Sequence, residues 1–340
     1  MRLRPRTLRG ETVVITGASA GVGRATAREL AGRGASVGLL ARAGGGLEAV
    51  EREIEAAGGR ALAIPTDVSD HDAVEAAADR IESELGPIGF WINDAMATIF
   101  ARVWDVEAEE IRRATEVTYL GAVNGTLAAL RRMRPRDHGK IVQVGSALSY
   151  RAIPLQSAYC GSKFALRGFT NSLRCELEAD GSAVQVTMAQ LPGLNTPQFT
   201  WVRTRGITNT PRPVAPVYQP EVAAKGIVFA ATHDRREVWV GGSTVATILG
   251  NKIAPSAADL YLAATNINAQ QTDRAVPPDR RDYLFEPLAE DRGAHGPFDD
   301  EAKTRSLQLA LSMHRGAVAL GAGALAAAAA ALVAGRRRLR

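Results

Sequence analysis

The hydrophobic positions of this chain form short apolar runs that alternate with longer amphipathic segments. Short apolar runs bounded by turn residues are typical of buried strands, and their alternation with helical segments predicts a parallel sheet. We expect strands at 12–16, 35–40, 61–65, 89–93, 141–144, 184–190 and 237–240. Helices are expected over 24–33, 47–57, from about 71, and over 107–133, 157–181 and 221–233. The pattern therefore predicts an α/β fold, a doubly wound parallel sheet with helices on both faces.

A glycine-rich turn joins the first strand to the first helix. The run Gly17-Ala18-Ser19-Ala20-Gly21-Val22-Gly23 follows the strand at 12–16 directly. Glycines allow backbone to approach a pyrophosphate, and a helix N-terminus supplies amide donors and the positive end of a dipole. A merely flexible Gly/Ala turn is the alternative, which the flanking strand and helix disfavour. The segment predicts a dinucleotide site of the Rossmann type.

Tyr159 and Lys163 are four residues apart on a predicted helix, so their side chains project from one face. An ammonium beside a phenol favours the phenolate and lowers the tyrosine pKa from about 10 toward working pH. Such a tyrosine can exchange a proton with an alcohol or carbonyl oxygen, which the Ser146 hydroxyl could hold. A Tyr-x-x-x-Lys pair by itself more often lies on a solvated helix face. A catalytic role for it therefore depends on the upstream nucleotide site.

The motifs Thr16-Gly-x-x-x-Gly-x-Gly23, Asp67, Ser146 and Tyr159-x-x-x-Lys163 together resemble the short-chain dehydrogenase/reductase family, over about residues 8–245. The resemblance implies a single Rossmann-type catalytic domain over 1–250 that transfers a hydride between a nicotinamide and a carbonyl or alcohol. Tyr159 would be the acid/base, and Lys163 would tune it while holding the nicotinamide ribose. Ser146 would orient the substrate oxygen.

The resemblance also implies a set of cofactor contacts. Asp67 would bind the adenine amino group, although capping of the helix near 71 is an alternative that Ser69 or Asp70 serves equally well. Thr196 would hydrogen-bond the nicotinamide carboxamide. The full set is Gly17, Ser19, Gly21, Val22, Gly23, Arg42, Asp67, Val68, Asn93, Ala95, Tyr159, Lys163, Pro192 and Thr196.

The end of the second strand bears on the choice of nucleotide. Sites that prefer NAD usually carry a carboxylate there for the ribose 2′-hydroxyl, whereas this chain has Leu40-Ala41-Arg42. Arginine offers a planar fork for a 2′-phosphate, so NADP(H) is favoured over NAD(H). The alternative is that Arg42 is only a surface residue at a strand end.

Two places depart from the family pattern. The chain has Asn93-Asp94-Ala95-Met96 where the family usually has Asn-Asn-Ala-Gly, which adds a charge and bulk near the cofactor. Thr118 stands where relatives have an asparagine that holds a water of the proton relay. A threonine has one hydroxyl in place of separate donor and acceptor ends, so we expect Thr118 in an altered relay. Asn124, two turns further on, is left open as a substitute.

The region after 193 is expected to cover the site. Residues 194–220 form a proline-broken loop, read as a substrate lid. Its aromatic residues Phe199, Trp201 and Tyr218 indicate either an apolar or bulky substrate or packing of the lid itself. Residues 251–313 form a polar, proline-rich extension, expected to be loosely ordered over 266–300.

Composition excludes few functions and points to one compartment. A chain of 340 residues with 46% apolar residues can bury one large core, and no basic patch interleaved with aromatic residues suggests nucleic acid. Cys160 and Cys175 lie too far apart on one predicted helix to bridge, which suggests either a reducing compartment or simply buried thiols. No spacing indicates a metal, and His295 reads as a loop residue. With no N-terminal apolar segment, we expect a cytoplasmic catalytic domain.

The tail is a separate prediction. Residues 316–335 carry no charge and would span about 30 Å as a helix, and basic residues 336–340 follow. We expect a transmembrane or membrane-associated helix, with an alanine-rich soluble helix or a disordered tail as alternatives.

Partners and a rival function complete the expectations. In relatives, the helices matching 107–133 and 157–179 pack against a second subunit, which implies a homodimer or tetramer acting on a small carbonyl or alcohol. The substrate would be apolar or lipid-like. The rival is a membrane-anchored nucleotide-binding regulatory or scaffold protein with little turnover. Thr118 and the 93–96 loop favour the rival, while the intact Ser146, Tyr159 and Lys163 oppose it.

Overall fold

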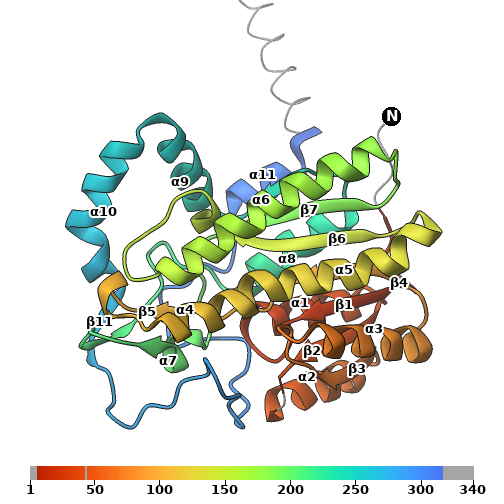
Figure 1. The fold of residues 1–340 in the computed structure, drawn as a ribbon, viewed down its shortest axis with the longest axis horizontal. Helices are drawn as coiled ribbons and strands as arrows, with labels where there is room; N and C mark the ends of the chain where they lie inside the picture. Colours follow the sequence, from red (N-terminus) through yellow and green to blue (C-terminus); the bar gives the residue numbers. More distant parts are fainter. Residues whose placement is uncertain (1–5, 43, 317–340) are drawn as a thin grey trace, which may run out of the picture.

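The fold is described by a computed structural model over residues 6–42 and 44–316. A parallel sheet of seven strands in the order β10-β7-β6-β4-β1-β2-β3 forms its centre (Figure 1). The strands are β1 (Thr12–Thr16), β2 (Ser36–Ala41), β3 (Arg60–Pro65), β4 (Ile88–Asn93), β6 (Lys140–Ser146), β7 (Gln185–Leu191) and β10 (Glu237–Trp239). The doubly wound α/β fold predicted from the alternating pattern is confirmed.

Helices cover both faces of this sheet. One face carries α1 (Gly21–Gly32), α2 (Gly45–Ala56), α8 (Pro220–Thr232) and α11 (Leu307–Met313), whose apolar side chains share one core cluster. The other carries α3 (His71–Leu85), α4 (Ala108–Thr115), α5 (Gly121–Met133) and α6 (Ser157–Ala179). Because both faces are buried, the strands read as continuous apolar runs rather than alternating ones.

The long helix predicted over 107–133 is interrupted. Between α4 and α5, residues Glu116–Leu120 form a π-helical turn, while the flanking Thr115 and Gly121 keep right-handed helical dihedral angles. A π-helical turn inside an α-helix is frequent at functional sites, and this one carries Thr118. Short 3₁₀ turns lie at Val103–Asp105, Arg134–Arg136 and Ala147–Ser149.

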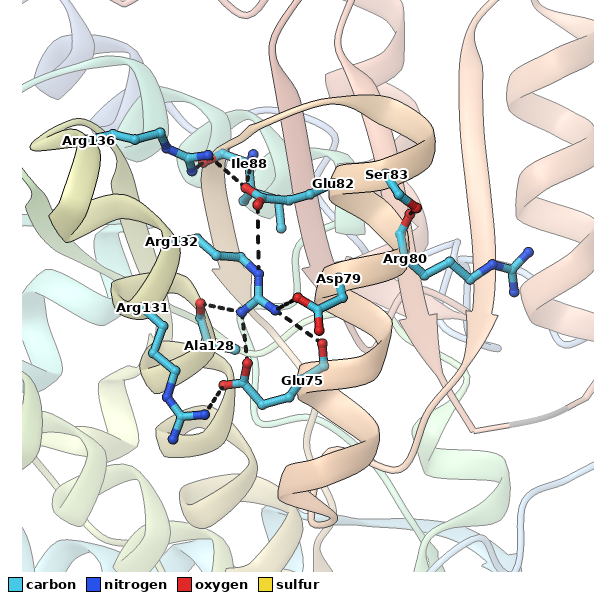
Figure 2. A network of polar contacts seen from close by, with 10 residues as sticks. All are labelled: Glu75, Asp79, Arg80, Glu82, Ser83, Ile88, Ala128, Arg131, Arg132 and Arg136. Atoms are coloured by element: carbon cyan, nitrogen blue, oxygen red, sulfur yellow. Dashed lines mark hydrogen bonds and ion pairs between the residues drawn. The ribbon is translucent and has the colours of Figure 1, made fainter.

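An ionic network joins α3 to α5 (Figure 2). The mostly buried Arg132 donates to Glu75 Oε2 at 2.9 Å and also pairs with Asp79. Arg136 donates to Glu82 Oε1 at 2.9 Å, and Arg131 lies 3.2 Å from Glu75 Oε1. A shared network of this kind fixes the angle between two helices better than an isolated surface pair does.

The predicted lid folds into short elements. It contains α7 (Gln198–Trp201), β8 (Arg203–Thr204), which pairs with β5 (Ile99–Phe100), and β9 (Asn209–Pro211), which pairs with β11 (Gln271–Ala275). Phe199 is buried between the rings of Phe100 and Phe298, at 6.0 and 5.8 Å between centroids. Helices α9 (Gly242–Ile253) and α10 (Pro255–Ala269) stand beside this region at one end of the molecule (Figure 1).

The expectation of a loosely ordered segment over 266–300 is wrong. Residues 266–269 complete α10, β11 follows, and Leu284 is fully buried against the main body. Backbone carbonyls of this segment accept hydrogen bonds from Arg42, Gly45 and Gly21. A polar composition thus reflects hydrogen bonding to the rest of the protein rather than disorder.

The predicted membrane helix 316–335 and basic residues 336–340 lie outside the described residues, apart from Gly316. Within 6–42 and 44–316, no helix combines the length and apolar character needed to cross a bilayer. Over the same residues, no cluster of three or more His, Cys, Asp or Glu is arranged to hold a metal ion. His295 pairs with Glu221 at 2.8 Å instead.

Gly125 on α5 faces β4 so closely that it admits no side chain. A Cβ there would lie 2.6 Å from Trp91 Nε1 and would also collide with Asn93 Oδ1. We predict that Gly125→Ala lowers the free energy of unfolding by about 1–3 kcal/mol, because the buried neighbours must shift. Urea denaturation followed by circular dichroism measures the change.

The matched control is Gly250→Ala on α9, where a Cβ would meet no atom within 4 Å. Alanine has the better helix propensity, so this substitution should leave stability unchanged or raise it by about 0.5–1 kcal/mol. Equal effects of the two substitutions would contradict the close packing of α5 on β4.

Candidate active site

The carboxyl ends of the central strands open into one cavity of about 580 Å³. The strands β1, β6 and β7 end at Thr16, Ser146 and Leu191, and the chain after each of them enters its wall. Most predicted site residues line it: Gly17, Ser19, Gly21, Val22, Arg42, Asp67, Val68, Ala95, Ser146, Tyr159, Lys163, Pro192 and Thr196. Gly23, Asn93 and Thr118 do not line it.

The glycine-rich turn is shaped by contacts with the loop after β4. Gly17 has a φ of +73°, and a Cβ there would lie 2.8 Å from Ala95 Cα. Thr16 Oγ1 accepts hydrogen bonds from the amides of Asp94 and Ala95, at 3.0 and 3.1 Å. A Cβ on Gly23 would collide with the Gly17 carbonyl. Gly23 therefore allows the close packing of the turn, and its role as a cofactor contact stays a prediction.

Helix α6 brings Tyr159 and Lys163 to the end of β6. The Lys163 Nζ lies 5.5 Å from the centroid of the Tyr159 ring and donates to the Val144 carbonyl at 2.6 Å. The Ser146 hydroxyl lies close enough to the Tyr159 hydroxyl to stabilise its anion. The three predicted catalytic groups thus converge at one point of the cavity wall.

The protonation of Tyr159 differs from the prediction. Burial raises the pKa of the Tyr159 phenol, and the hydrogen bond with Ser146 offsets only part of that increase. Lys163, whose own pKa burial lowers, does not bring the pKa of Tyr159 toward neutrality as expected. The phenol is therefore held in its protonated form, the form that donates a proton to a carbonyl oxygen.

Asp94 brings a carboxyl group into the same cavity. Burial raises the pKa of Asp94 above the ordinary carboxyl range, and the nearby Lys163 charge opposes that shift. Two residues on, the Met96 sulfur accepts a hydrogen bond from the Tyr283 hydroxyl at 3.5 Å. The same hydroxyl accepts from the Thr98 amide at 3.1 Å. The altered loop is therefore packed against the extension.

Three polar side chains discussed for the site, those of Thr118, Asn93 and Asn124, have hydrogen-bond partners within the protein. The Thr118 hydroxyl is fully buried, donates to the Ala97 carbonyl and accepts from the Ala97 amide, both at 2.8 Å. Asn93 is buried and bonded to Trp91, Thr126 and Gln143. Asn124 donates to the carbonyls of Val68 and Ser69. Neither Thr118 nor Asn93 lines the cavity, and their roles in the proton relay and the cofactor site stay predictions.

The opposite end of the cavity contains Asp67 and Arg42. Burial alone would raise the pKa of Asp67, but hydrogen bonds from Arg113 and Ser69 outweigh it and lower the pKa. Asp70, with its carboxylate 3.0 Å from the amides of Asp72 and Ala73, caps α3, so capping does not explain Asp67. Arg42 donates to the carbonyls of Tyr283, Leu284 and Phe285. It is therefore more than a surface residue at a strand end.

Thr196 offers a direct test of fit for a dinucleotide. Its Oγ1 is buried and lines the cavity, yet has no hydrogen-bond partner among the described residues. An unpartnered buried hydroxyl costs free energy unless a ligand satisfies it. The glycine-rich turn at the start of α1 lies in the same cavity, so the residues present fit a nicotinamide dinucleotide.

Comparison with known proteins decides the family. The sequence profile described as "short chain dehydrogenase" matches residues 11–205, more than half of the chain. The chain belongs to this family. Its members are NAD(P)-dependent oxidoreductases, and the fold described above is that of such an enzyme.

Relatives of this dehydrogenase are named as oxidoreductases. "Uncharacterized oxidoreductase YxnA" of Bacillus subtilis is 30% identical over 286 residues, which cover 84% of this chain and 80% of the relative. "3-Dehydrosphinganine reductase" of Danio rerio is 33% identical over 236 residues, covering 66% and 69%. A solved structure, a metagenomic short-chain oxidoreductase in complex with NADP, is 28% identical with a TM-score of 0.58 and covers 69% of this chain and 98% of that one.

Sequence reasoning missed part of the cavity wall of this short-chain dehydrogenase. Tyr283, Leu288 and Arg292 line the cavity although they lie in the polar extension. No periodic pattern marks them, because the segment from 276 to 306 forms no helix or strand. The apolar pair Tyr283-Leu284 among charged residues is the signal that could have indicated a buried anchor.

We predict that Thr118→Val lowers the free energy of unfolding by about 2 kcal/mol, because the buried Ala97 amide and carbonyl lose their partner. Valine keeps the branched shape, so packing changes little. Urea denaturation gives the stability, and nucleotide turnover per folded molecule gives the activity. An unchanged free energy of unfolding with a large loss of turnover would indicate that Thr118 takes part in the proton relay.

Proposed function

We propose that this dehydrogenase interconverts a carbonyl and an alcohol with NADP(H), with Tyr159 as the acid/base. The observation that carries the proposal is the convergence of Tyr159, Lys163 and Ser146 in a cavity whose far end holds the glycine-rich turn. The unpartnered hydroxyl of Thr196, which lines the same cavity, supports a nicotinamide carboxamide as its partner.

The chain's own residues divide the work of the reduction. A bound nicotinamide would supply the hydride. Ser146 holds the carbonyl oxygen, and the protonated Tyr159 gives that oxygen its proton. The Lys163 ammonium stabilises the phenolate that remains, because opposite charge nearby favours the ionised form. Oxidation of an alcohol runs through the same groups in reverse.

Two observations support NADP(H) over NAD(H). Arg42 lines the cavity at the end of β2, where no carboxylate is available for a ribose 2′-hydroxyl. The similar metagenomic oxidoreductase was solved with NADP. Arg42 also holds the extension, so its two roles must be separated by experiment.

An apolar or bulky substrate is supported by the rest of the cavity. Phe199, Trp201, Tyr261 and Leu262 line it together with Ile153. Two relatives are named as reductases of a dehydrosphinganine and of a ketoacyl compound, the 3-dehydrosphinganine reductase of Danio rerio and the "Ketoacyl reductase HetN" of Nostoc sp.. The side chains of Leu120, Leu127 and Phe164, exposed near and on α5 and α6, support a homodimer or tetramer through these helices.

Membrane association through 316–340 remains a prediction that the described residues do not test. The competing function is a nucleotide-binding scaffold or regulatory protein at the membrane. Nucleotide binding without turnover on a broad panel of ketones, quinones and long-chain carbonyls would favour that rival. Membrane fractionation of the full chain against one ending before Gly316 tests the tail separately.

We predict that Tyr159→Phe lowers turnover of NADPH with a carbonyl panel by at least about 100-fold, because the proton donor is lost. Nucleotide binding should be retained, since the ring remains. Steady-state absorbance of NADPH and equilibrium binding by fluorescence measure the two quantities.

The control is Tyr119→Phe, which keeps the ring that packs against Phe169 at 6.4 Å and removes only the hydroxyl. Its turnover should match that of the unmodified protein. A Tyr159→Phe protein with full activity would show that another group donates the proton.

We predict that Arg42→Gln reduces the preference for NADPH over NADH by about tenfold, because the guanidinium no longer meets a 2′-phosphate. The readout is the ratio of the two dissociation constants. Loosening of residues 283–285 affects both nucleotides alike and cancels in that ratio. An unchanged ratio with both affinities weakened would leave Arg42 only as an anchor of the extension.

A further inference from the structure

Residues 282–296, called here the covering segment, cross the nucleotide end of the cavity. After β11 the chain, drawn in blue in Figure 1, passes α7 and reaches α2. There the Gly45 amide donates to the Ala289 carbonyl at 3.0 Å, and a Cβ on Gly44 would lie 2.5 Å from the Leu288 oxygen. The Gly21 amide at the start of α1 donates to the Gly293 carbonyl at 3.1 Å. The segment therefore spans from the end of β2 to the glycine-rich turn.

An ion pair fixes the middle of the covering segment. Arg24 on α1 is only 4% exposed and bonds Asp291 as well as Glu53 on α2. Asp291 Oδ1 also accepts from the Gly293 amide at 3.0 Å. A buried guanidinium with two carboxylate partners is a strong anchor, because removing one partner leaves charge uncompensated. Residue 292 is thereby held between two fixed neighbours.

The cations that line the cavity are Arg42, Arg151, Lys163 and Arg292. Arg42 donates to three carbonyls, Arg151 bonds Asn251 and Asp259, and Lys163 donates to Val144 beside Tyr159. Arg292 makes no hydrogen bond within the described residues. It lies 3.8 Å from Glu290 and 5.9 Å from the Trp201 ring centroid. Its donors therefore have no hydrogen-bond partner within the described residues, and Gly293, the next residue, bonds the Gly21 amide of the glycine-rich turn.

The glycine-rich turn itself brings no cation, because Ala20 stands between Ser19 and Gly21. A nicotinamide dinucleotide carries a negative diphosphate that prefers the start of a helix such as α1. On the basis of the proposed nucleotide site, we infer that the covering segment is part of it and that Arg292 binds the phosphates. The neighbouring Glu290, which also lines the cavity, opposes that binding by like charge.

This assignment predicts opposite effects for two adjacent substitutions. Arg292→Gln should weaken binding of NADPH and of NADH about tenfold each, because a charge-assisted contact to a shared phosphate is lost. Glu290→Gln should strengthen both. Isothermal titration calorimetry or nucleotide fluorescence on the full chain measures the dissociation constants without any substrate.

The control is Arg80→Gln on α3, an arginine of similar exposure whose partner is Glu84 at 2.7 Å. It should leave nucleotide affinity unchanged. Thermal unfolding of all three variants shows that they are folded. Affinities that stay equal for Arg292→Gln and the unmodified protein would overturn the assignment while leaving the proposed function intact. If the unmodified protein binds neither nucleotide, both the proposed function and the assignment are wrong.

Discussion

The hydrogen bond from Lys163 Nζ to the Val144 carbonyl is the contact on which the geometry of the site depends. It links the second turn of α6 to β6, two residues before that strand ends at Ser146. An ammonium that is 3% exposed needs a partner, and the strand carbonyl provides one at the place where the sheet ends. Tyr159, one turn earlier on α6, is thereby brought beside Ser146. The position of Tyr159 beside Ser146 therefore follows from the hydrogen bond that the buried Lys163 ammonium makes.

The parallel sheet explains why so much could be predicted from the sequence. Buried parallel strands are nearly continuous apolar runs, so β1, β4 and β6 are visible as such, and the residues after them must meet at one edge. The prediction that Gly17, Asp67, Ser146 and Tyr159 share a site needed only this topology and the family resemblance.

The remaining features depend on partners that are distant in sequence. The sequence could not show that the Thr118 hydroxyl is bonded to both backbone polar groups of Ala97, twenty-one positions away. The same holds for Asn93, whose buried side chain donates hydrogen bonds to Thr126 and Gln143. The pKa of Tyr159 was misjudged because the cost of burial outweighs the pairing that spacing suggests. The order in the extension comes from contacts with Arg24, Arg42 and Arg113, which no local pattern reveals.

The contact between Tyr283 and Met96 has a consequence for how relatives can be used. The metagenomic oxidoreductase is covered over 98% of its length by 69% of this chain, so nearly a third of this molecule has no aligned counterpart in it. Tyr283 nevertheless bonds the very loop in which this chain departs from the family motif. The bulk of Met96 and the stretch of chain around Tyr283 thus form one packed unit. A homologue that lacks either part is therefore no guide to the end of the cavity that residues after 280 enclose.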